Sequence, residues 1–488
     1  MLAGRRCRTA LSRTAMPPSS ELKRGLTLSA AIAVNVANMI GTGVFLKSRV
    51  MTCNVGSASL VLVVWLAAGL LSLAGTFVYS ELAAMLPDAG GEYVYLRRAF
   101  GPLAGFLNGW TNNLARSASQ AALAVGLAIF MNVALQGALA SVTVPLAGLS
   151  VSGLTVIALL TVATVTLLNC ASVTASGRTA LVLTVAKVVL VALVALVALI
   201  GPGDFAHLVA SGAGGRCEGV AGTARGGLAG FGAAMLGALW AYDGWNNVAP
   251  LVGELKDPKR NAPRAFVGGT LVVGTLYLLA NLGYFYALGP EEVASIPATG
   301  SVATAVLLRV VGPVATTLMA VALMASSFGS QHASALAGAR VTYAMASDGL
   351  FFRALTRLSA AGVPARAVLL QGSMAAVLVC LGTYDTLTDA AIFSSWIFFG
   401  LTGVALFVLR AREPDAVRPY RVPGYPWVPA VFVLVTIAIL VNTFVATPVQ
   451  ALESVALLVL GLPFYAHWSR ARAAVAHTPG RPVEPGDP

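Results

Sequence analysis

The chain has 488 residues, of which 57% are hydrophobic and only 10% are charged. Its mean hydropathy is +0.82, whereas soluble globular domains carry about 25% charged residues. This composition excludes a soluble globular protein and predicts an all-α polytopic membrane protein. Long continuous apolar runs also exclude an outer-membrane barrel, because barrel strands alternate between apolar and polar residues.

The net charge of +12 does not indicate a nucleic-acid partner, because the basic residues are unevenly placed along the chain. If the amino terminus is cytoplasmic, 24 Lys and Arg residues fall in inside segments and three fall within spans. Four fall in outside loops, namely Lys47, Arg49, Arg216 and Arg225. The positive-inside rule therefore predicts that both termini are cytoplasmic. We expect a multi-pass protein of the plasma or bacterial inner membrane, surrounded by lipid.

Twelve apolar segments are candidates to cross the hydrocarbon core, which takes about 20 helical residues. They are residues 26–51, 58–86, 101–136, 150–170, 177–201, 226–253, 264–289, 302–346, 364–383, 386–410, 427–446 and 450–468. Segment 302–346 is too long for one crossing, and we expect it to continue into the cytoplasm. Residues 1–21 and 469–488 are expected to be cytoplasmic tails, because they are rich in proline and charge.

Two of these segments are interrupted near their middle by residues that an apolar helix avoids. Residues 38–44 include Gly41 and Gly43, and residues 240–246 include Asp243. Glycine costs a helix about 0.8–1.0 kcal/mol relative to alanine, and hydrocarbon tolerates unwound backbone only where protein or a wet cavity encloses it. Discontinuous helices at matching places in two repeats are a sequence pointer to the substrate site of a transporter.

The five cysteines do not show the spacing of a metal site, and neither a metal nor a cofactor is expected. Only Cys53 and Cys217 fall in predicted outside loops. A disulfide is allowed in that compartment, but the sequence does not lead us to expect one between them.

Several stretches of the chain are long enough to point to a family. One reads YSELA at residues 79–83 and PDAGGEYVYLRRAFGP at residues 87–102, and it resembles the amino acid-polyamine-organocation superfamily. Three more resemble the L-type amino acid transporter family within it, in a bacterial-like form. They read IGTGVF at 40–45, AYDGWNN at 241–247 followed by GELKDP at 253–258, and RPYRVPGYP at 418–426. The resemblance covers roughly residues 22–446.

The resemblance implies a LeuT-like fold of twelve transmembrane helices, with a five-plus-five inverted repeat, helices 1 and 6 broken, and two additional C-terminal helices. The repeats would be residues 22–201 and 226–410, followed by the last two helices at 427–468. It also implies amino acid substrates. Eukaryotic L-type relatives often pair with a heavy chain through a cysteine after the third span. Residues 137–150 contain no cysteine, so we expect no disulfide-linked heavy chain.

An amino acid needs clustered donors for its carboxylate and clustered acceptors for its ammonium. The helix that restarts after Gly41, Thr42 and Gly43 would offer free N–H groups and the positive end of its dipole. Backbone carbonyls near both breaks could accept from the ammonium, as they do in the family; the candidates belong to Ile40, Trp240, Ala241 and Tyr242. Close packing of helices through small residues is the alternative explanation for the glycines.

The second break contributes further candidates. Trp240 resembles the aromatic gate that closes over substrate in this family, and the alternative is an ordinary packing aromatic. Asp243 could receive a cationic side chain, carry a proton or cap a half-helix, and we favour the cap. Four residues could either line the pocket or bond one helix to another; they are Asn246 and the seventh-span Tyr277, Asn281 and Tyr284.

Lys187 lies near the middle of segment 177–201, where an ammonium costs about 2.5–3.5 kcal/mol. Its position resembles the fifth-span lysine that takes the place of a sodium ion in sodium-independent relatives. That resemblance implies a link from the first break to the eighth-span hydroxyls of Ser326, Ser327 and Ser330. A lysine that merely pairs within the structure is the alternative.

Arg116 resembles the arginine of an Arg-Pro-x-Ser-Gln stretch of the family, but Ser117 stands where the family often has proline. We therefore expect Arg116 to reach toward the cytoplasmic face or to pack against a neighbour.

Together these features favour a sodium-independent exchanger or facilitator of neutral L-amino acids that works by alternating access. The alternative is a proton-coupled or cationic amino acid transporter in which Lys187 or Asp243 carries the coupled charge. A membrane-bound enzyme is not expected, because the spans contain no metal cluster and no paired nucleophile and base.

Overall fold

The computed structural model describes residues 25–88, 90–146, 149–171, 176–212, 214–359 and 363–476. Within these ranges, seven helices are long and apolar enough to cross a membrane. An eighth span results if α1 and α2, which are bent by 41° at their junction, are counted as one. The expected polytopic helical architecture is therefore confirmed. The predicted tail at residues 1–21 and the end of the other tail, residues 477–488, lie outside the described residues.

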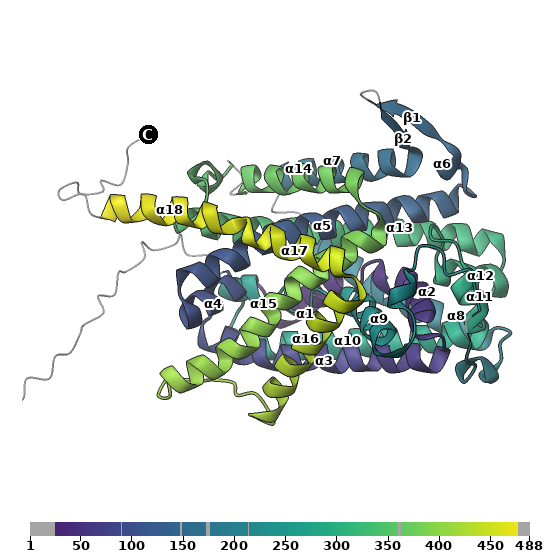
Figure 1. Cartoon of the computed structure of the whole chain (residues 1–488), viewed down its shortest axis with the longest axis horizontal. Coiled ribbons are helices and arrows are strands. Elements are labelled where there is room, and N and C mark those ends of the chain that lie inside the picture. Colours follow the sequence, from purple (N-terminus) through teal and green to yellow (C-terminus); the bar gives the residue numbers. More distant parts are fainter. Residues whose placement is uncertain are drawn as a thin grey trace, which may run out of the picture.

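The long helices run side by side through the body of the molecule, and Figure 1 shows α5 next to α13 and α3 next to α10. Their bounds are α3 Ala58–Met85, α5 Pro102–Ala134, α7 Gly153–Ala171, α8 Ser176–Ile200, α10 Pro258–Ala287, α13 Pro313–Ser347, α14 Ala365–Leu381, α15 Tyr384–Arg412 and α16 Trp427–Ala446. Proline begins α5, α10 and α13. Its missing N–H costs nothing at that position, because the first N–H groups of a helix lack an intrahelical acceptor.

Shorter helices connect or interrupt the long ones. They are α1 Leu28–Met39, α2 Gly43–Val55, α4 Glu92–Phe100, α6 Ala138–Ser141, α9 Gly227–Tyr242, α11 Pro290–Ser295, α12 Val302–Val310, α17 Pro448–Val459 and α18 Gly461–Ala476. A small antiparallel hairpin of β1 Thr143–Leu146 and β2 Leu149–Ser152 precedes α7. In Figure 1 this hairpin and the end of α18 lie at opposite ends of the molecule.

Two predicted segments differ from the structure. The extra length of segment 302–346 lies partly at its beginning, where α12 ends before Gly312 and α13 starts at Pro313. Gly312 has a φ of +99° and proline has no N–H to continue the ladder, so the helix cannot run through. At the C-terminal end, α18 continues to Ala476 and takes in residues that we expected to be tail.

The two cysteines that we did not expect to pair form a disulfide. Cys53 near the end of α2 is bonded to Cys217 in the loop before α9, across a sequence separation of 164 residues. The sequence argument was wrong because Cα atoms that are distant along the chain lie 5.6 Å apart in the fold. The bond ties the far end of α2 to the loop that enters the second interrupted segment.

Helix α4 and the loop after α15 are held by acidic side chains. The hydroxyl of Tyr93 donates to Asp348 at 2.5 Å. Glu81 on α3 is fully buried and accepts from Arg410 Nη2 at 2.6 Å and from the Val422 backbone N–H at 2.7 Å. Two of the motifs that suggested the family therefore meet in space, and both position the elements that surround the site described next.

Candidate functional site

The first break separates α1 from α2 at residues 40–42. The N–H of Ile40 still donates to the Val36 carbonyl, at 2.9 Å, and α2 then begins at Gly43. The first N–H groups of a helix have no intrahelical acceptor, and here they belong to Thr42, Gly43 and Val44. This end of α2 therefore directs donors and a positive dipole end into the middle of the protein.

The second break follows α9, which ends at Tyr242. Gly244 has a φ of +104°, and the chain continues as turns into a 3-10 helix at Ala249–Glu254. A Cβ on Gly244 would lie 2.9 Å from the Asn38 carbonyl carbon. A Cβ on Gly43 would lie 2.6 Å from the Ala241 Cα. The two breaks thus touch, and glycine is required because backbone approaches backbone.

Tyr277 on α10 joins the two breaks directly. Its hydroxyl lies 2.7 Å from the Met39 carbonyl oxygen and 3.0 Å from the Ala241 carbonyl oxygen. These are carbonyls at the C-terminal ends of α1 and α9. A second link runs through Tyr384 on α15, whose hydroxyl lies 2.7 Å from Thr42 Oγ1 and accepts from Trp240 Nε1 at 3.0 Å.

A cavity lies between the breaks, and we call it the central cavity. Its lining residues are Asn38, Met39, Gly41, Thr42, Gly43, Arg116, Ser119, Leu123, Trp240, Asp243, Asn247, Ser330 and Ser334. Six candidates from the sequence are among them: Gly41, Thr42, Gly43, Trp240, Asp243 and Ser330.

The remaining candidates lie elsewhere. The Ile40 carbonyl accepts from Ser330 Oγ at 3.1 Å. Tyr242 points to α3 and donates to the Trp65 carbonyl at 3.2 Å. Asn281 accepts from Ser48 Oγ at 2.5 Å, so it bonds α10 to α2, which was the alternative for this residue.

Lys187 on α8 is 3% exposed and reaches the C-terminal end of α1. Its Nζ donates to the Ala37 carbonyl at 3.1 Å and to Ser330 Oγ at 2.5 Å. A cation is favourable at this end of a helix, because it meets the unpaired carbonyls and the negative dipole end. Of the three expected hydroxyls, Ser330 makes the contact; Ser327 donates to the Leu323 carbonyl instead, and Ser326 Oγ has no partner in the described structure.

Lys47 and Arg49 are not loop residues, contrary to our expectation. Both lie in α2, which continues to Val55, and are 1% and 3% exposed. Lys47 Nζ lies 2.8 Å from Asp385 Oδ1 and 3.2 Å from Asp389 Oδ1, and Arg49 lies 3.6 Å from Asp385. These four residues, which we call the α2–α15 charge cluster, join the restarted half of the first span to α15.

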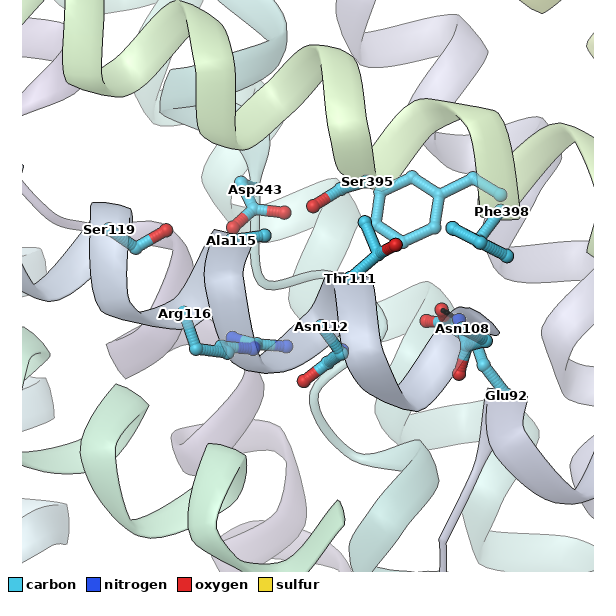
Figure 2. Close-up of a pocket in the computed structure, with 11 residues that line it drawn as sticks. Glu92, Asn108, Thr111, Asn112, Ala115, Arg116, Ser119, Asp243, Ser395 and Phe398 are labelled. Carbon is cyan, nitrogen blue, oxygen red and sulfur yellow. Dashed lines mark hydrogen bonds between the residues drawn. The ribbon is translucent and has the colours of Figure 1, made fainter. Parts of the chain in front are cut away.

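A second, narrow cavity lies on the side of α4, and we call it the α4-side cavity. It shares Arg116, Ser119 and Asp243 with the central cavity. Figure 2 shows the oxygens of Asp243 and Ser395 facing each other, with Glu92 beside Asn108 at another corner. The other lining residues are Thr111, Asn112, Ala115, Phe398 and Phe399.

Glu92 is the buried acid of the α4-side cavity. It accepts from Asn246 and, at 3.2 Å, from Asn108 Nδ2. Burial raises the pKa of the Glu92 carboxyl, and these hydrogen bonds together with the charge of Arg116 oppose that rise. Asn246 therefore hydrogen-bonds to α4 and does not line the central cavity.

Arg116 contacts a neighbour, which is one of the two places that we expected for it. It is 8% exposed, lines both cavities and hydrogen-bonds to Asn247 beyond the second break. A signal for this existed in the sequence, because six small or polar residues of α5 recur at helical spacing. They are Asn108, Thr111, Asn112, Ala115, Arg116 and Ser119.

Comparison with known proteins finds related sequences along nearly the whole chain. A family model described as amino acid permease matches residues 26–463. The chain is 28% identical to the mouse b(0,+)-type amino acid transporter 1, over 95% of this chain and 92% of that protein. It is also 28% identical to a serine/threonine exchanger of Bacillus subtilis, over 93% and 98% of the two chains. The human large neutral amino acids transporter small subunit 2 is 29% identical, over 91% and 80%.

Each of these relatives is named for moving amino acids, and none is named for an enzymatic reaction. The family match covers both interrupted segments, all residues of the central cavity and the α2–α15 charge cluster. The chain therefore belongs to the amino acid permease family, and it is a multi-pass membrane transporter of amino acids.

Proposed function

We propose that this protein exchanges neutral L-amino acids without sodium, and that the amino acid binds in the central cavity. The observation that carries the proposal is the contact of two interrupted helices around one cavity. Gly43 and Ala241 approach so closely that no side chain fits at Gly43. Donors and acceptors that ordinary helices use internally are thereby directed at one small space.

The carboxylate of the substrate would take the N–H groups of Thr42, Gly43 and Val44, as anions do at helix N-termini. The ammonium would take carbonyls at the ends of α1 and α9. The Ile40 and Ala241 carbonyls already accept one hydrogen bond each, from Ser330 and Tyr277. A carbonyl oxygen has two lone pairs, so each retains capacity for an ammonium.

Trp240 would close one side of the bound substrate. Its indole lines the central cavity and donates to the Tyr384 hydroxyl, and the two rings meet edge to face with centroids 6.5 Å apart. Tyr384 directly precedes Asp385 of the charge cluster. Separation of α15 from α2 would therefore withdraw the partner of Trp240 and admit substrate, which is one half of an alternating-access cycle.

Sodium independence is supported by the position of Lys187. Its ammonium contacts a carbonyl of α1 and a hydroxyl of α13, which are oxygen ligands of the kind that a hard cation uses. A fixed positive charge at that point repels a second cation. Ser326 belongs to the same part of α13 and keeps an unpaired hydroxyl in the described structure.

We also propose the finer architecture. Residues 22–201 and 226–410 would form two five-helix repeats, followed by two helices at 427–468, which gives twelve spans with both termini cytoplasmic in the plasma or inner membrane. Residues 137–150 contain no cysteine. The protein would accordingly function without a disulfide-linked heavy chain.

The second candidate is transport of cationic amino acids or coupling to protons through Asp243. It is favoured by the position of this carboxyl, which lines both cavities. Arg116 lines the same two cavities and already supplies a positive charge beside it. This arrangement leaves less negative potential for a cationic side chain, and it is why neutral substrates are preferred here.

Purified protein in liposomes tests the proposal. Labelled alanine, serine, leucine and arginine are offered with and without amino acid inside. We expect uptake of the neutral amino acids that depends on internal amino acid. Arginine uptake, or uptake into empty vesicles driven by a pH gradient, would support the second candidate instead.

Gly43→Ala adds a structural arm to this experiment. The new methyl would collide with backbone of the second break, so we expect exchange to be abolished. Gly268→Ala on α10 is the matched control, because its Cβ would meet only Ile32 Cδ1, at 3.8 Å. Equal exchange by both variants would contradict the proposed site.

A further inference from the structure

Arg116 lines the central cavity, the α4-side cavity and a third cavity near the start of α4. A guanidinium carries five N–H donors. The described contacts of Arg116 use one nitrogen, which donates to Asn247 Oδ1. A charged group in a transmembrane span is expensive and is usually found at a substrate or ion pathway. Arg116 therefore has donors available for an anionic group in any of the three cavities.

The α4-side cavity offers the complementary groups. Two carboxylates line it, Glu92 from α4 and Asp243 from the second break. Thr111 is 3% exposed and its Oγ1 has no partner in the described structure. The Oδ1 of Asn112 is likewise buried and unpaired there. Buried polar atoms usually have a hydrogen-bond partner, so these two atoms can bond to a polar molecule in the cavity.

One wall of the α4-side cavity is apolar. Phe398 and Phe399 of α15 and Ala115 of α5 all line it, and each phenylalanine is 3% exposed. A guanidinium, two carboxylates and an aromatic wall around one space match the three parts of an amino acid: a carboxylate, an ammonium and a side chain that carries no charge.

We propose that the α4-side cavity, which must widen to admit an amino acid, is a second station for the transported amino acid, between the central cavity and α4. The α-carboxylate binds Arg116, the ammonium binds Asp243 or Glu92, and the side chain lies against Phe398. Because Arg116, Ser119 and Asp243 line both cavities, the molecule moves from one station to the other without losing its charged partners. This inference rests on the proposed function and extends it to the route of release.

The competing explanation is that Arg116 only positions Asn247 and thereby the second break. In that case its loss would weaken binding equally from both sides of the membrane. A station on the α4 side predicts a one-sided effect, because substrate arriving from that side meets Arg116 before it meets the N–H groups of α2.

The test uses the full chain in vesicles of known orientation, with labelled L-serine offered to one face at a time. We call the side of the membrane on which α4 lies the α4 face. For Arg116→Gln we expect the serine concentration that half-saturates uptake from the α4 face to rise about tenfold or more, which is the effect of losing a charged hydrogen bond. On the opposite face it should change much less. Arg98→Lys is the control, because Arg98 is exposed and pairs with Glu413 outside the cavities.

Arg116→Lys and serinamide, which lacks the carboxylate, complete the design. Arg116→Lys keeps the charge but not the planar fork, and it should show a smaller one-sided loss. Serinamide should compete with serine less well at the α4 face of the unchanged protein, and this preference should disappear in Arg116→Gln. Retained exchange from the opposite face shows that the variants are folded.

Two results would overturn the proposal in distinguishable ways. Equal changes at both faces, or no change at either, would refute the second station while leaving the proposed function intact. Failure of the unchanged protein to move any amino acid would refute the proposed function, and the station with it.

Discussion

Lys47 and Lys187 are both almost completely buried, at 1% and 3% exposure. Lys47 belongs to one half of the broken first span, and Lys187 contacts the other half. Lys47 belongs to α2 and meets two carboxylates, at 2.8 Å and 3.2 Å. Lys187 comes from α8 to the end of α1 and meets a carbonyl and a hydroxyl. Among the described residues, no carboxylate lies within ion-pair distance of Lys187.

The difference indicates two mechanical roles. An ion pair near the surface can separate at modest cost, since water solvates both charges when the helices part. Asp385 and Asp389 are 35% and 38% exposed, so this pair lies near the surface of the protein. Lys187 instead neutralises the dipole end of α1, a contact with no solvated alternative. We infer that α2 is the half that moves against its partner, and that the end of α1 stays fixed.

Replacing Lys187 should have the largest effect. In Lys187→Ala, Ser330 and the Ala37 carbonyl lose a charged donor, which is worth about 1.5–3 kcal/mol. We expect the exchange rate in liposomes to fall more than about tenfold. The measurement is the initial rate at which labelled serine is taken up into liposomes that contain unlabelled serine. The samples contain equal amounts of folded protein. Exchange at the normal rate would refute the role of this lysine.

Replacing Lys47 should have a smaller effect of a different kind. Removal of one partner from a fully buried pair costs about 3–5 kcal/mol, but the exposure of both carboxylates reduces this to about 1–2 kcal/mol. Lys47→Ala should lower the melting temperature. It should also slow exchange, but by a factor several-fold smaller than the factor for Lys187→Ala. Lys47→Met combined with Asp389→Asn removes a charge of each sign and should recover part of the loss. If Lys47→Ala instead reduced exchange as much as Lys187→Ala, the two lysines would not differ in role.

The sequence allowed prediction of the breaks and of a lysine inside a span, because these signals are local, whereas the link from Lys187 to Ser330 was implied by the family resemblance. Glycine inside an apolar segment and a lysine at mid-span are both visible without knowledge of the packing. The charge cluster was missed because Asp385 and Asp389 lie more than 300 residues from Lys47 along the chain. The positive-inside rule counts basic residues by segment, so Lys47 contributed to the predicted topology but its carboxylate partners were not identified.

Other errors have the same origin. The spacing of Tyr277, Asn281 and Tyr284 gave one face of α10, but not which neighbour that face meets. Asn281 meets Ser48 of α2, whereas Tyr277 meets both breaks. The place of Arg116 between the cavities was not predicted, because the polar stripe of α5 was not followed as a whole. Pairing of the two cysteines, 164 residues apart, likewise depends on tertiary contacts that no local pattern contains.

The disulfide provides a third, weaker way to test the comparison. Cys53 lies in the same helix as Lys47, and the bond to Cys217 limits how far the end of α2 can travel. Cys53→Ser should lower stability by about 2–4 kcal/mol, as removal of a disulfide typically does. Its effect on exchange should be smaller than that of Lys47→Ala, because the charge cluster remains. Reduction of the unchanged protein should reproduce the result, and Cys380→Ser, an exposed free cysteine, is the control.

Removal of sodium should have no effect on exchange. Sodium would need oxygen ligands at the end of α1, and the ammonium of Lys187 already contacts the Ala37 carbonyl and Ser330 there. Exchange in choline chloride should therefore equal exchange in sodium chloride at the same ionic strength. The α2–α15 charge cluster carries both signs, so a matched ionic strength also keeps screening constant. A requirement for sodium would mean that a cation binds beside Lys187, and the fixed role assigned to this lysine would then have to be given to the bound ion.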